Sequence, residues 1–269
     1  MICELENTHF SKVADLFQGR KQYLPVFAII NGNFPGRIFV DDEDCPNTAL
    51  VWAISRWAYV DGNPQKGSFN DSLASLIKDV IIPGSLQIKM NWFELYTADS
   101  ADWKAAIDDS LGGYKPERHY ETVFTFDRGR YLASRRSPAL PEGSRIERAK
   151  FPILPDAARD APFVAERFGA KTSFGYRLLR DNKVISVCRS NGFISGREFM
   201  IDIYTSDEDQ RCKGCATAVG TALIDYCLKQ RYIPLWETTL DNVPSQKVAH
   251  KLGFVESGSY PVYAIEFCG

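Results

Sequence analysis

The sequence predicts a mixed α/β protein with an N-terminal domain, a linker and a C-terminal domain. Strand-like and helix-like runs alternate along most of the 269 residues. A stretch rich in Arg, Ser, Pro and Gly, residues 129–155, interrupts this pattern and predicts a linker. After it, a strand at 198–204 leads through a polar loop into a long helix. The expected domains are therefore 1–128 and 156–269.

Composition narrows the classes of protein to which the chain can belong. It is 45% hydrophobic and 25% charged, as ordinary globular proteins are. The net charge of −2 provides no overall attraction to nucleic acid, so no nucleic-acid partner is expected. No apolar run is long enough to cross a bilayer and no secretory signal is visible, so no membrane partner is expected. Seven scattered cysteines are typical of reduced thiols, which predicts a cytoplasmic location.

The N-terminal domain reads as a helix followed by strands, and then as alternating helices and strands. The clearest helix is amphipathic, with apolar residues Leu73, Leu76, Ile77 and Val80 at helical spacing. The last strand alternates apolar and polar residues. The expected elements are helix 9–17, strands 23–30, 37–40 and 48–59, helix 69–80, strand 92–96, helix 102–111 and strand 119–126.

The C-terminal domain begins with a helix and a hairpin around the turn Arg180-Asp181-Asn182. The next strand, 198–204, has an apolar face and a mixed face, and the mixed face carries Glu198 and Asp202. The expected elements are helix 157–168, strands 174–179, 183–189 and 198–204, helix 216–229, strand 233–236, helix 245–252 and strand 260–267.

The loop before helix 216–229 has the properties of an anion site. A helix N-terminus presents backbone N–H groups without intrahelical partners and a partial positive charge. Gly214 and the small Ala216 permit close approach of a ligand to the backbone, and Arg211 and Lys213 add positive charge. These features predict binding of a pyrophosphate. The glycine spacing fits neither a Walker loop nor a dinucleotide fingerprint.

The motif Arg211-x-x-Gly214-x-Ala216 resembles the one with which GNAT N-acetyltransferases hold the pyrophosphate of coenzyme A. The downstream residues Pro234, Trp236, Asn242, Ser245 and Ala249–Phe254, with Tyr260 and Tyr263, resemble a branch that includes relatives of zwittermicin A resistance acetyltransferases. The resemblance covers about residues 198–263. It implies a GNAT fold with splayed strands, acetyl-CoA as cosubstrate, and an N-acetyltransferase. We interpret residues 1–128 as a degenerate GNAT-like repeat, with an unrelated α/β domain as the alternative.

The resemblance also implies where the cofactor binds. The backbone of strand 198–204 would pair with the pantetheine arm, the N–H groups of Gly214, Cys215 and Ala216 would hold the pyrophosphate, and Asn242 would position the pantetheine. The expected cofactor-binding residues are Ile203, Tyr204, Thr205, Arg211, Cys212, Lys213, Gly214, Cys215, Ala216, Thr217, Asn242 and Ser245.

Amine acetylation requires removal of a proton. An alkyl amine with a pKa of ~10 costs ~4 kcal/mol to deprotonate at pH 7. GNAT enzymes commonly use an acidic side chain as the base, and the candidates here are Asp202, Glu198 and Glu237, for each of which a solvated or ion-paired role is the alternative. The tyrosine that usually protonates the leaving thiolate is replaced by Ala249. Tyr260 is the expected substitute, with Ser245, His250 and Tyr263 as alternatives, and departure of the thiolate without an acid is a further alternative.

Two rival interpretations remain. A GNAT fold without the usual tyrosine is also compatible with a non-catalytic module that binds acyl-CoA or a partner. Cys212-x-x-Cys215 has the spacing of a redox dithiol or of half a zinc site. No second cysteine pair or histidine cluster with ligand spacing accompanies it among the three histidines, so no metal site is expected. The expected acceptor is the amine of a small molecule, and acetylation of a protein stays a further alternative.

Overall fold

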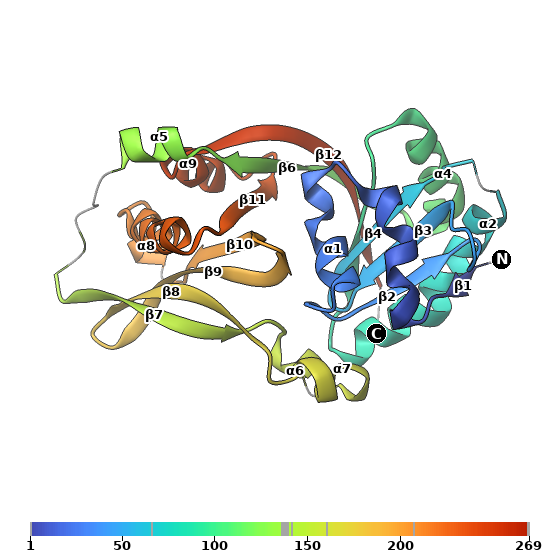
Figure 1. Cartoon of the computed structure of the whole chain (residues 1–269), viewed down its shortest axis with the longest axis horizontal. Coiled ribbons are helices and arrows are strands. Elements are labelled where there is room, and N and C mark those ends of the chain that lie inside the picture. The colour runs from blue at the N-terminus through green and yellow to red at the C-terminus, as the bar shows by residue number, and fades with distance from the viewer. Residues whose placement is uncertain are drawn as a thin grey trace. The chain divides into compact units, whose positions relative to one another are not determined.

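The computed structural model describes residues 2–65, 67–135, 140, 142–159, 161–206 and 208–267. The chain divides into two compact units, each built from several segments. Unit 1 comprises Met1–Glu121, Leu154–Ala170 and Ser259–Gly269, and unit 2 comprises Thr122–Ile153 and Lys171–Gly258. Two strands, β6 (Glu117–Phe126) and β12 (Phe254–Glu266), therefore contribute residues to both units (Figure 1).

Unit 1 is a sheet with the strand order β1-β2-β3-β4-β5-β12-β6. Its β4–β5 pair is parallel, whereas β1–β2, β2–β3, β3–β4 and β5–β12 are antiparallel. A chain of ring contacts, Phe17–Tyr23–Tyr59–Tyr96–Tyr260, runs through its interior, with centroids 5.0 to 6.3 Å apart. The elements are β1 (Cys3–Glu4), 3₁₀ helices Asn7–Phe17 and Lys21–Tyr23, α1 (Leu24–Ile30), β2 (Gly36–Val40), β3 (Thr48–Ala53), β4 (Trp57–Gly62), α2 (Gly67–Leu76), the π-helical turn Ile77–Ile81, α3 (Ile82–Gln87), β5 (Trp92–Tyr96), α4 (Ala101–Leu111), the 3₁₀ turn Gly112–Tyr114, α6 (Asp156–Arg159) and α7 (Pro162–Phe168).

Two predictions for unit 1 were wrong. The apolar run 23–30 forms helix α1 instead of a strand, and Pro25 lies in its first turn, where the fixed φ of proline favours a helix. A short apolar run buried on most sides carries no period that separates the two structures. The single strand expected at 48–59 is the hairpin β3–β4. Both strands are almost entirely buried, so their sequence is apolar nearly throughout and does not show where one strand ends and the next begins.

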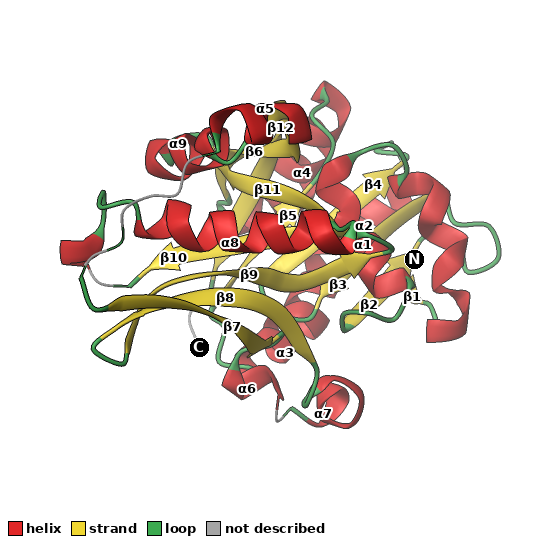
Figure 2. Cartoon of the chain, turned by 60° about the vertical axis from the view of Figure 1, so that its left-hand side comes forward, coloured by secondary structure: helices red, strands yellow, loops and turns green. Residues whose placement is uncertain are grey.

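Unit 2 is a sheet with the order β12-β6-β11-β10-β9-β8-β7, and helix α8 lies along one of its faces (Figure 2). Its β10–β11 pair is parallel, and β7–β8, β8–β9 and β9–β10 are antiparallel. The core beneath α8 includes Val219, Leu223, Phe199 and Trp236, all 2% exposed or less. The elements are α5 (Arg128–Ser134), β7 (Ser144–Pro152), β8 (Thr172–Arg180), β9 (Lys183–Ser195), β10 (Glu198–Thr205), the 3₁₀ turn Glu208–Gln210, α8 (Cys215–Gln230), β11 (Ile233–Thr239) and α9 (Val243–Lys251).

The segment expected to be a linker contains helix α5 and strand β7, while residues 136–139 and Pro141 lie outside the described residues. Strand β7 is the last strand in the order of unit 2, and its charged side chains are typical of an edge strand. Its composition is therefore as polar as that of a linker. The predicted division into 1–128 and 156–269 follows the sequence and stays a prediction. The compact units group the segments differently, because α6 and α7 belong to unit 1.

The order of elements from β1 to β6 recurs from β7 to β12, apart from the 3₁₀ turns Gly112–Tyr114 and Glu208–Gln210: one strand, a helical connection, three strands, a helix, a strand, a helix and a strand. The helical connection contains two 3₁₀ helices and α1 in the first copy, and α6 and α7 in the second. In the first copy the central helix consists of α2, the π-helical turn and α3. The parallel pair occupies the same place in both copies, as β4–β5 and β10–β11. This recurrence agrees with the repeat that the sequence analysis predicts. Among the described residues, no helix is both long enough and apolar enough to span a membrane.

Candidate functional site

The first component of the candidate site is the place where β10 and β11 separate. Their parallel ladder has three pairs and ends at Met200↔Leu235, although β10 continues to Thr205 and β11 to Thr239. On its other edge β10 stays paired with β9 as far as Thr205, with a register shift between Phe199 and Ile201. Such a bulge bends a strand. The edge of residues 201–205 that faces β11 is therefore outside the β10–β11 ladder, and an extended ligand could pair with it.

The second component is the loop that begins α8. Gly214 immediately precedes the helix with a φ of +82°, a conformation in which a side chain would be strained. Its carbonyl accepts a hydrogen bond from the N–H of Ala218, at 2.9 Å, which starts the helical ladder. The 16 residues of α8 align their peptide dipoles toward this end. The geometry is that of an anion-binding helix N-terminus.

The side chains of the loop differ in exposure. Arg211, Cys212 and Lys213 are exposed, whereas Cys215 is buried. The guanidinium of Arg211 pairs with the carboxylate of Glu208 at 3.0 Å, and both side chains are more than half exposed. Exposed pairs of this kind contribute little free energy, so Arg211 can exchange Glu208 for an anionic ligand.

The three candidate carboxylates share one face of the sheet. Directly paired residues of parallel strands point to the same side, and side chains alternate along each strand. Since Met200 pairs with Leu235, the side chains of Glu198, Asp202 and Glu237 lie on the face opposite the core that packs under α8. Sequence alternation predicted this for Glu198 and Asp202, and the register adds Glu237.

Asp202 already has a partner on this face. Nε of Arg189 on β9 donates to Oδ2 of Asp202 at 2.8 Å, and the two side chains are 28% and 36% exposed. Gly175 on β8 makes room for Arg189, because a Cβ at Gly175 would lie 2.5 Å from the Arg189 Cβ. The ion-paired alternative is thus observed for Asp202, whereas Glu198 and Glu237 are half-buried.

Several other predicted cofactor residues make structural contacts. Oδ1 of Asn242 accepts from the N–H of Ser245 at 3.2 Å and caps α9, while Oγ of Ser245 accepts from Nε1 of Trp236 at 3.1 Å. The hydroxyl of Thr205 lies 3.0 Å from that of Ser186. The remaining four are Ile203, partly buried against the core, Tyr204, which is 47% exposed, Ala216, half-buried in the first turn of α8, and Thr217, whose carbonyl accepts from the hydroxyl of Thr221.

The candidates for the acid are divided between the two units. Tyr260 belongs to unit 1, where its ring lies 5.9 Å from that of Tyr96, whereas the three carboxylates belong to unit 2. Tyr263 is buried in unit 1, and burial raises the pKa of its hydroxyl. His250 packs edge-on against Phe124, with its Nδ1 3.3 Å from the carbonyl of Phe254. Ala249, at the usual tyrosine position, is fully buried.

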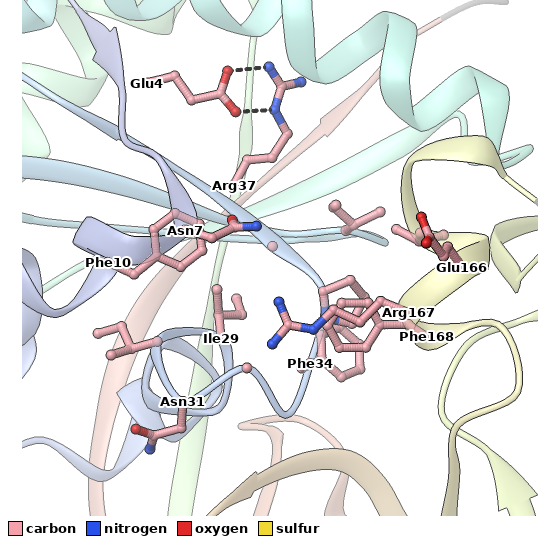
Figure 3. A pocket seen from close by; sticks show the side chains of 16 residues that line it. Glu4, Asn7, Phe10, Ile29, Asn31, Phe34, Arg37, Glu166, Arg167 and Phe168 are labelled. Carbon is pink, nitrogen blue, oxygen red and sulfur yellow. Dashed lines mark hydrogen bonds and ion pairs between the residues drawn. The ribbon is translucent and has the colours of Figure 1, made fainter.

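Unit 1 contains a pocket of about 520 Å³ that the sequence analysis missed (Figure 3). Its rim includes a two-pronged ion pair between Arg37 and Glu4, at 2.7 and 2.6 Å. The guanidinium of Arg167 points into it beside Phe34, above Gly32, where a Cβ would lie 2.3 Å from Nη2. No sequence signal marks this pocket, because α7 comes from a segment more than 120 residues after α1.

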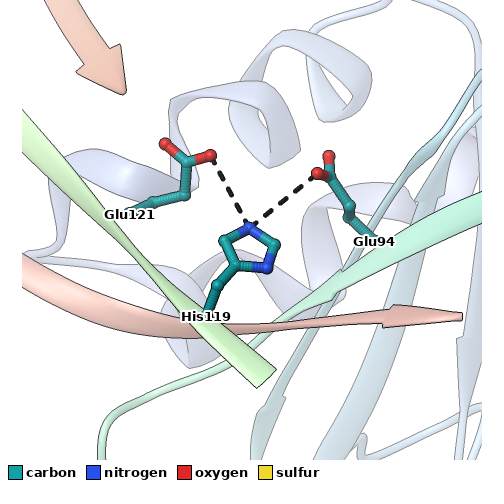
Figure 4. Close-up of side chains that lie close together, drawn as sticks. All are labelled: Glu94, His119 and Glu121. Atoms are coloured by element: carbon teal, nitrogen blue, oxygen red, sulfur yellow. Dashed lines mark ion pairs between the residues drawn. The ribbon is translucent and has the colours of Figure 1, made fainter. Parts of the chain in front are cut away.

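Unit 1 also brings together Glu94, His119 and Glu121 (Figure 4). His119 and Glu121 occupy alternate positions of the predicted strand 119–126, which places them on one face. Glu94 belongs to β5, and only the strand order brings it near. Spacing along the chain gives no sign of this group, because Glu94 is distant from His119 in the sequence.

The sequence matches a protein family and a known relative over most of its length. A family model described as GNAT acetyltransferase matches residues 14–263. The chain is 24% identical, over 97% of both chains, to a Bacillus subtilis (strain 168) protein named uncharacterized N-acetyltransferase YdfB.

Solved structures show the same fold. A GCN5-related N-acetyltransferase-like protein from Streptococcus suis 89/1591 aligns with a TM-score of 0.67 and 22% identity, over 96% of this chain and 99% of that chain. A tandem GNAT protein from the clavulanic acid biosynthesis pathway aligns with a TM-score of 0.62 and 14% identity, over 99% and 98%. The match to the family model spans both repeats, and the chain belongs to the GNAT acetyltransferase family.

Proposed function

We propose that the protein is an N-acetyltransferase that moves an acetyl group from acetyl-CoA to the amine of a small molecule by direct attack in a ternary complex. The observation that carries the proposal is the position of the left-handed Gly214 at the start of α8, downstream of the strand whose ladder with β11 ends at Met200. One ligand with a pyrophosphate and an extended amide arm would use both features.

In this proposal the cofactor lies along the separated strands. The first-turn N–H groups of α8 and the side chains of Arg211 and Lys213 would hold the pyrophosphate. The edge of Ile203–Thr205 would pair with the amides of the pantetheine arm, as an added strand does. Asn242 and Ser245 would keep the start of α9 rigid beside the arm, through the contacts they make with each other and with Trp236.

The reaction needs a base near the carboxylate face. The amine nitrogen attacks the thioester carbonyl carbon, the C–S bond breaks, and the coenzyme A thiolate leaves. One of Asp202, Glu198 and Glu237 would accept the amine proton, directly or through water. Arg189 donates to Oδ2 of Asp202, so Asp202 would accept the amine proton at Oδ1, or else it would position Arg189. We keep Tyr260 as the proposed proton donor to the thiolate.

Calorimetric titration with acetyl-CoA tests cofactor binding. Gly214→Trp should abolish binding, because the indole would fill the approach to the helix N-terminus. Gly19→Trp is a matched control: Gly19 also has a φ of +82° and has open space around it. If the wild type does not bind acetyl-CoA, or if both variants bind as the wild type does, the loop is not the cofactor site and the proposal fails.

A non-catalytic acyl-CoA-binding module is the second candidate, favoured by the buried Ala249 at the tyrosine position. A screen of amines for coenzyme A thiol release, with mass analysis of the products, separates the two. An acetylated amine whose formation depends on Gly214 supports the enzyme. Tight acetyl-CoA binding without turnover on any amine supports the module.

A further inference from the structure

A second candidate site lies in unit 1, apart from the cofactor loop. Figure 4 shows that the carboxylates of Glu94 and Glu121 both point toward Nε2 of His119. Glu94 comes from β5, and His119 and Glu121 come from β6. Strand β12 lies between these two strands, and its residue directly opposite Glu94 is Ala264. The small side chain of Ala264 leaves space on the shared face for Glu94 to reach toward β6.

The distances within the group are too long for hydrogen bonds. Nε2 of His119 lies 4.0 Å from Oε1 of Glu94 and 3.9 Å from Oε1 of Glu121. A hydrogen bond between such atoms would bring them to about 2.7 to 3.2 Å. All three atoms lie within 4.8 Å of one another. Ligand atoms about 2.0 to 2.2 Å from one cation are about 3 to 4 Å apart, so a small inward movement of these side chains would close the group around a cation.

Burial makes this arrangement costly unless positive charge compensates it. Glu94 and Glu121 are 7% and 8% exposed. Buried carboxylates require pairing or a metal ion. The other carboxylate oxygen of Glu94, Oε2, has two partners. The hydroxyl of Tyr96 donates to it at 3.1 Å, and Nε of Arg56 lies 3.4 Å from it. These partners orient Oε1 toward His119, as outer-shell groups orient metal ligands.

We propose that Glu94, His119 and Glu121 form a binding site for a divalent transition-metal cation such as Zn²⁺. One imidazole nitrogen and two carboxylate oxygens suit Zn²⁺ and its neighbours in the first row better than Mg²⁺, which prefers oxygen ligands alone. The side chain of His119 is 28% exposed, so a cation can enter from solvent, and a fourth position remains for water or another ligand.

Tag-free protein, stripped with a chelator, would be titrated with ZnCl₂ and separately with MgCl₂ by calorimetry. We expect one Zn²⁺ per chain, a higher unfolding temperature in its presence, and much weaker binding of Mg²⁺. His119→Ala and Glu121→Gln should each weaken Zn²⁺ binding by more than about 100-fold. Cobalt substitution should add visible absorption bands in the wild type that both variants lack.

Two controls separate this site from other zinc ligands. His9→Ala removes a half-buried histidine that pairs with one carboxylate in the described structure, Glu43 at 3.8 Å, and should leave Zn²⁺ binding unchanged. Cys212→Ser removes the exposed thiol of the Cys-x-x-Cys segment and should also leave it unchanged. Absence of Zn²⁺ binding, or binding that His119→Ala and Glu121→Gln do not affect, would overturn the proposal and leave an ion-paired cluster without a metal.

Discussion

The two units share one plan and differ at two places where chemistry is concentrated. Both have a parallel ladder of three residue pairs, which ends at Tyr59↔Tyr96 in unit 1 and at Met200↔Leu235 in unit 2. After this ladder, unit 2 has the left-handed Gly214 and a continuous helix of 16 residues, whereas the helix of unit 1 passes through a π-helical turn. Within the described residues, unit 2 alone combines a left-handed glycine before its central helix with an unbroken helix of 16 residues.

The second difference lies at a buried, charged residue of unit 1. Two positions before the end of the ladder, β5 carries Glu94 and β11 carries Ile233. Two positions after it, β4 carries Asp61 and β10 carries Asp202. Both aspartates pair with an arginine, Arg20 in unit 1 and Arg189 in unit 2. Repetition has thus kept the backbone plan and an Asp–Arg pair, whereas other matched positions such as Glu94 and Ile233 have diverged, and matched variants can measure the consequences.

The largest expected effect concerns catalysis. If Asp202 is the base, or positions Arg189 beside it, Asp202→Asn should lower kcat by about 100- to 10,000-fold. The matched change Asp61→Asn removes the corresponding ion pair in unit 1 and should leave kcat within a few-fold of the wild type. Steady-state kinetics with the amine found in the screen would check both. Unchanged turnover in Asp202→Asn would move the role of base to Glu198 or Glu237.

The next effect concerns the stability of each unit. Leu223 in α8 and Ile77 in the π-helical turn are both 0% exposed. Replacing either with alanine should cost about 2 to 5 kcal/mol of unfolding free energy, because a cavity adds to the lost burial. Denaturant unfolding followed by two probes would show whether each variant shifts the whole transition. A shift confined to one phase would mean that the units unfold separately.

A smaller effect distinguishes two glycines at corresponding strands. A Cβ at Gly175 on β8 would lie 2.7 Å from backbone atoms of Cys188 and Arg189, whereas the three atoms nearest to one at Gly36 on β2 belong to the side chain of Ile29. Gly175→Ala should therefore destabilise the protein by about 1 to 3 kcal/mol and Gly36→Ala by less, because a side chain can move and a strand cannot. Chemical denaturation of the two variants provides the comparison, and equal losses would contradict it.

The smallest effect depends on pH. Burial raises the pKa of Cys227 in unit 2 from 9.0 to about 12. The thiol ionises in the unfolded chain before it does so in the folded protein, so its contribution to stability is complete below pH 9 and is lost as pH rises toward 12. The loss should approach about 1.4 kcal/mol per pH unit. The difference between the denaturant midpoints at pH 8 and at pH 10 should be smaller in Cys227→Ala than in the wild type. An equal pH dependence in both proteins would exclude Cys227 as the cause.

Much of unit 2 was predictable because its signals are local. The alternation along β10, the glycine before α8 and the polar cap of α9 each depend on residues within a few positions of one another. Unit 1 was less predictable. Helix α1 and the β3–β4 hairpin are buried on most sides, and burial on every face removes the periodicity by which a strand and a helix are told apart.

The sequence by itself determined the family motif, the glycine that precedes helix α8 and the sharing of a face by Glu198 and Asp202, because these follow from spacing along one or two elements. Only the tertiary structure decided that Asp202 meets Arg189, that Tyr260 belongs to unit 1, and that Glu94 joins His119 and Glu121. Those neighbours are set by strand order and register. Both depend on long-range pairing, which the local pattern of a sequence does not specify.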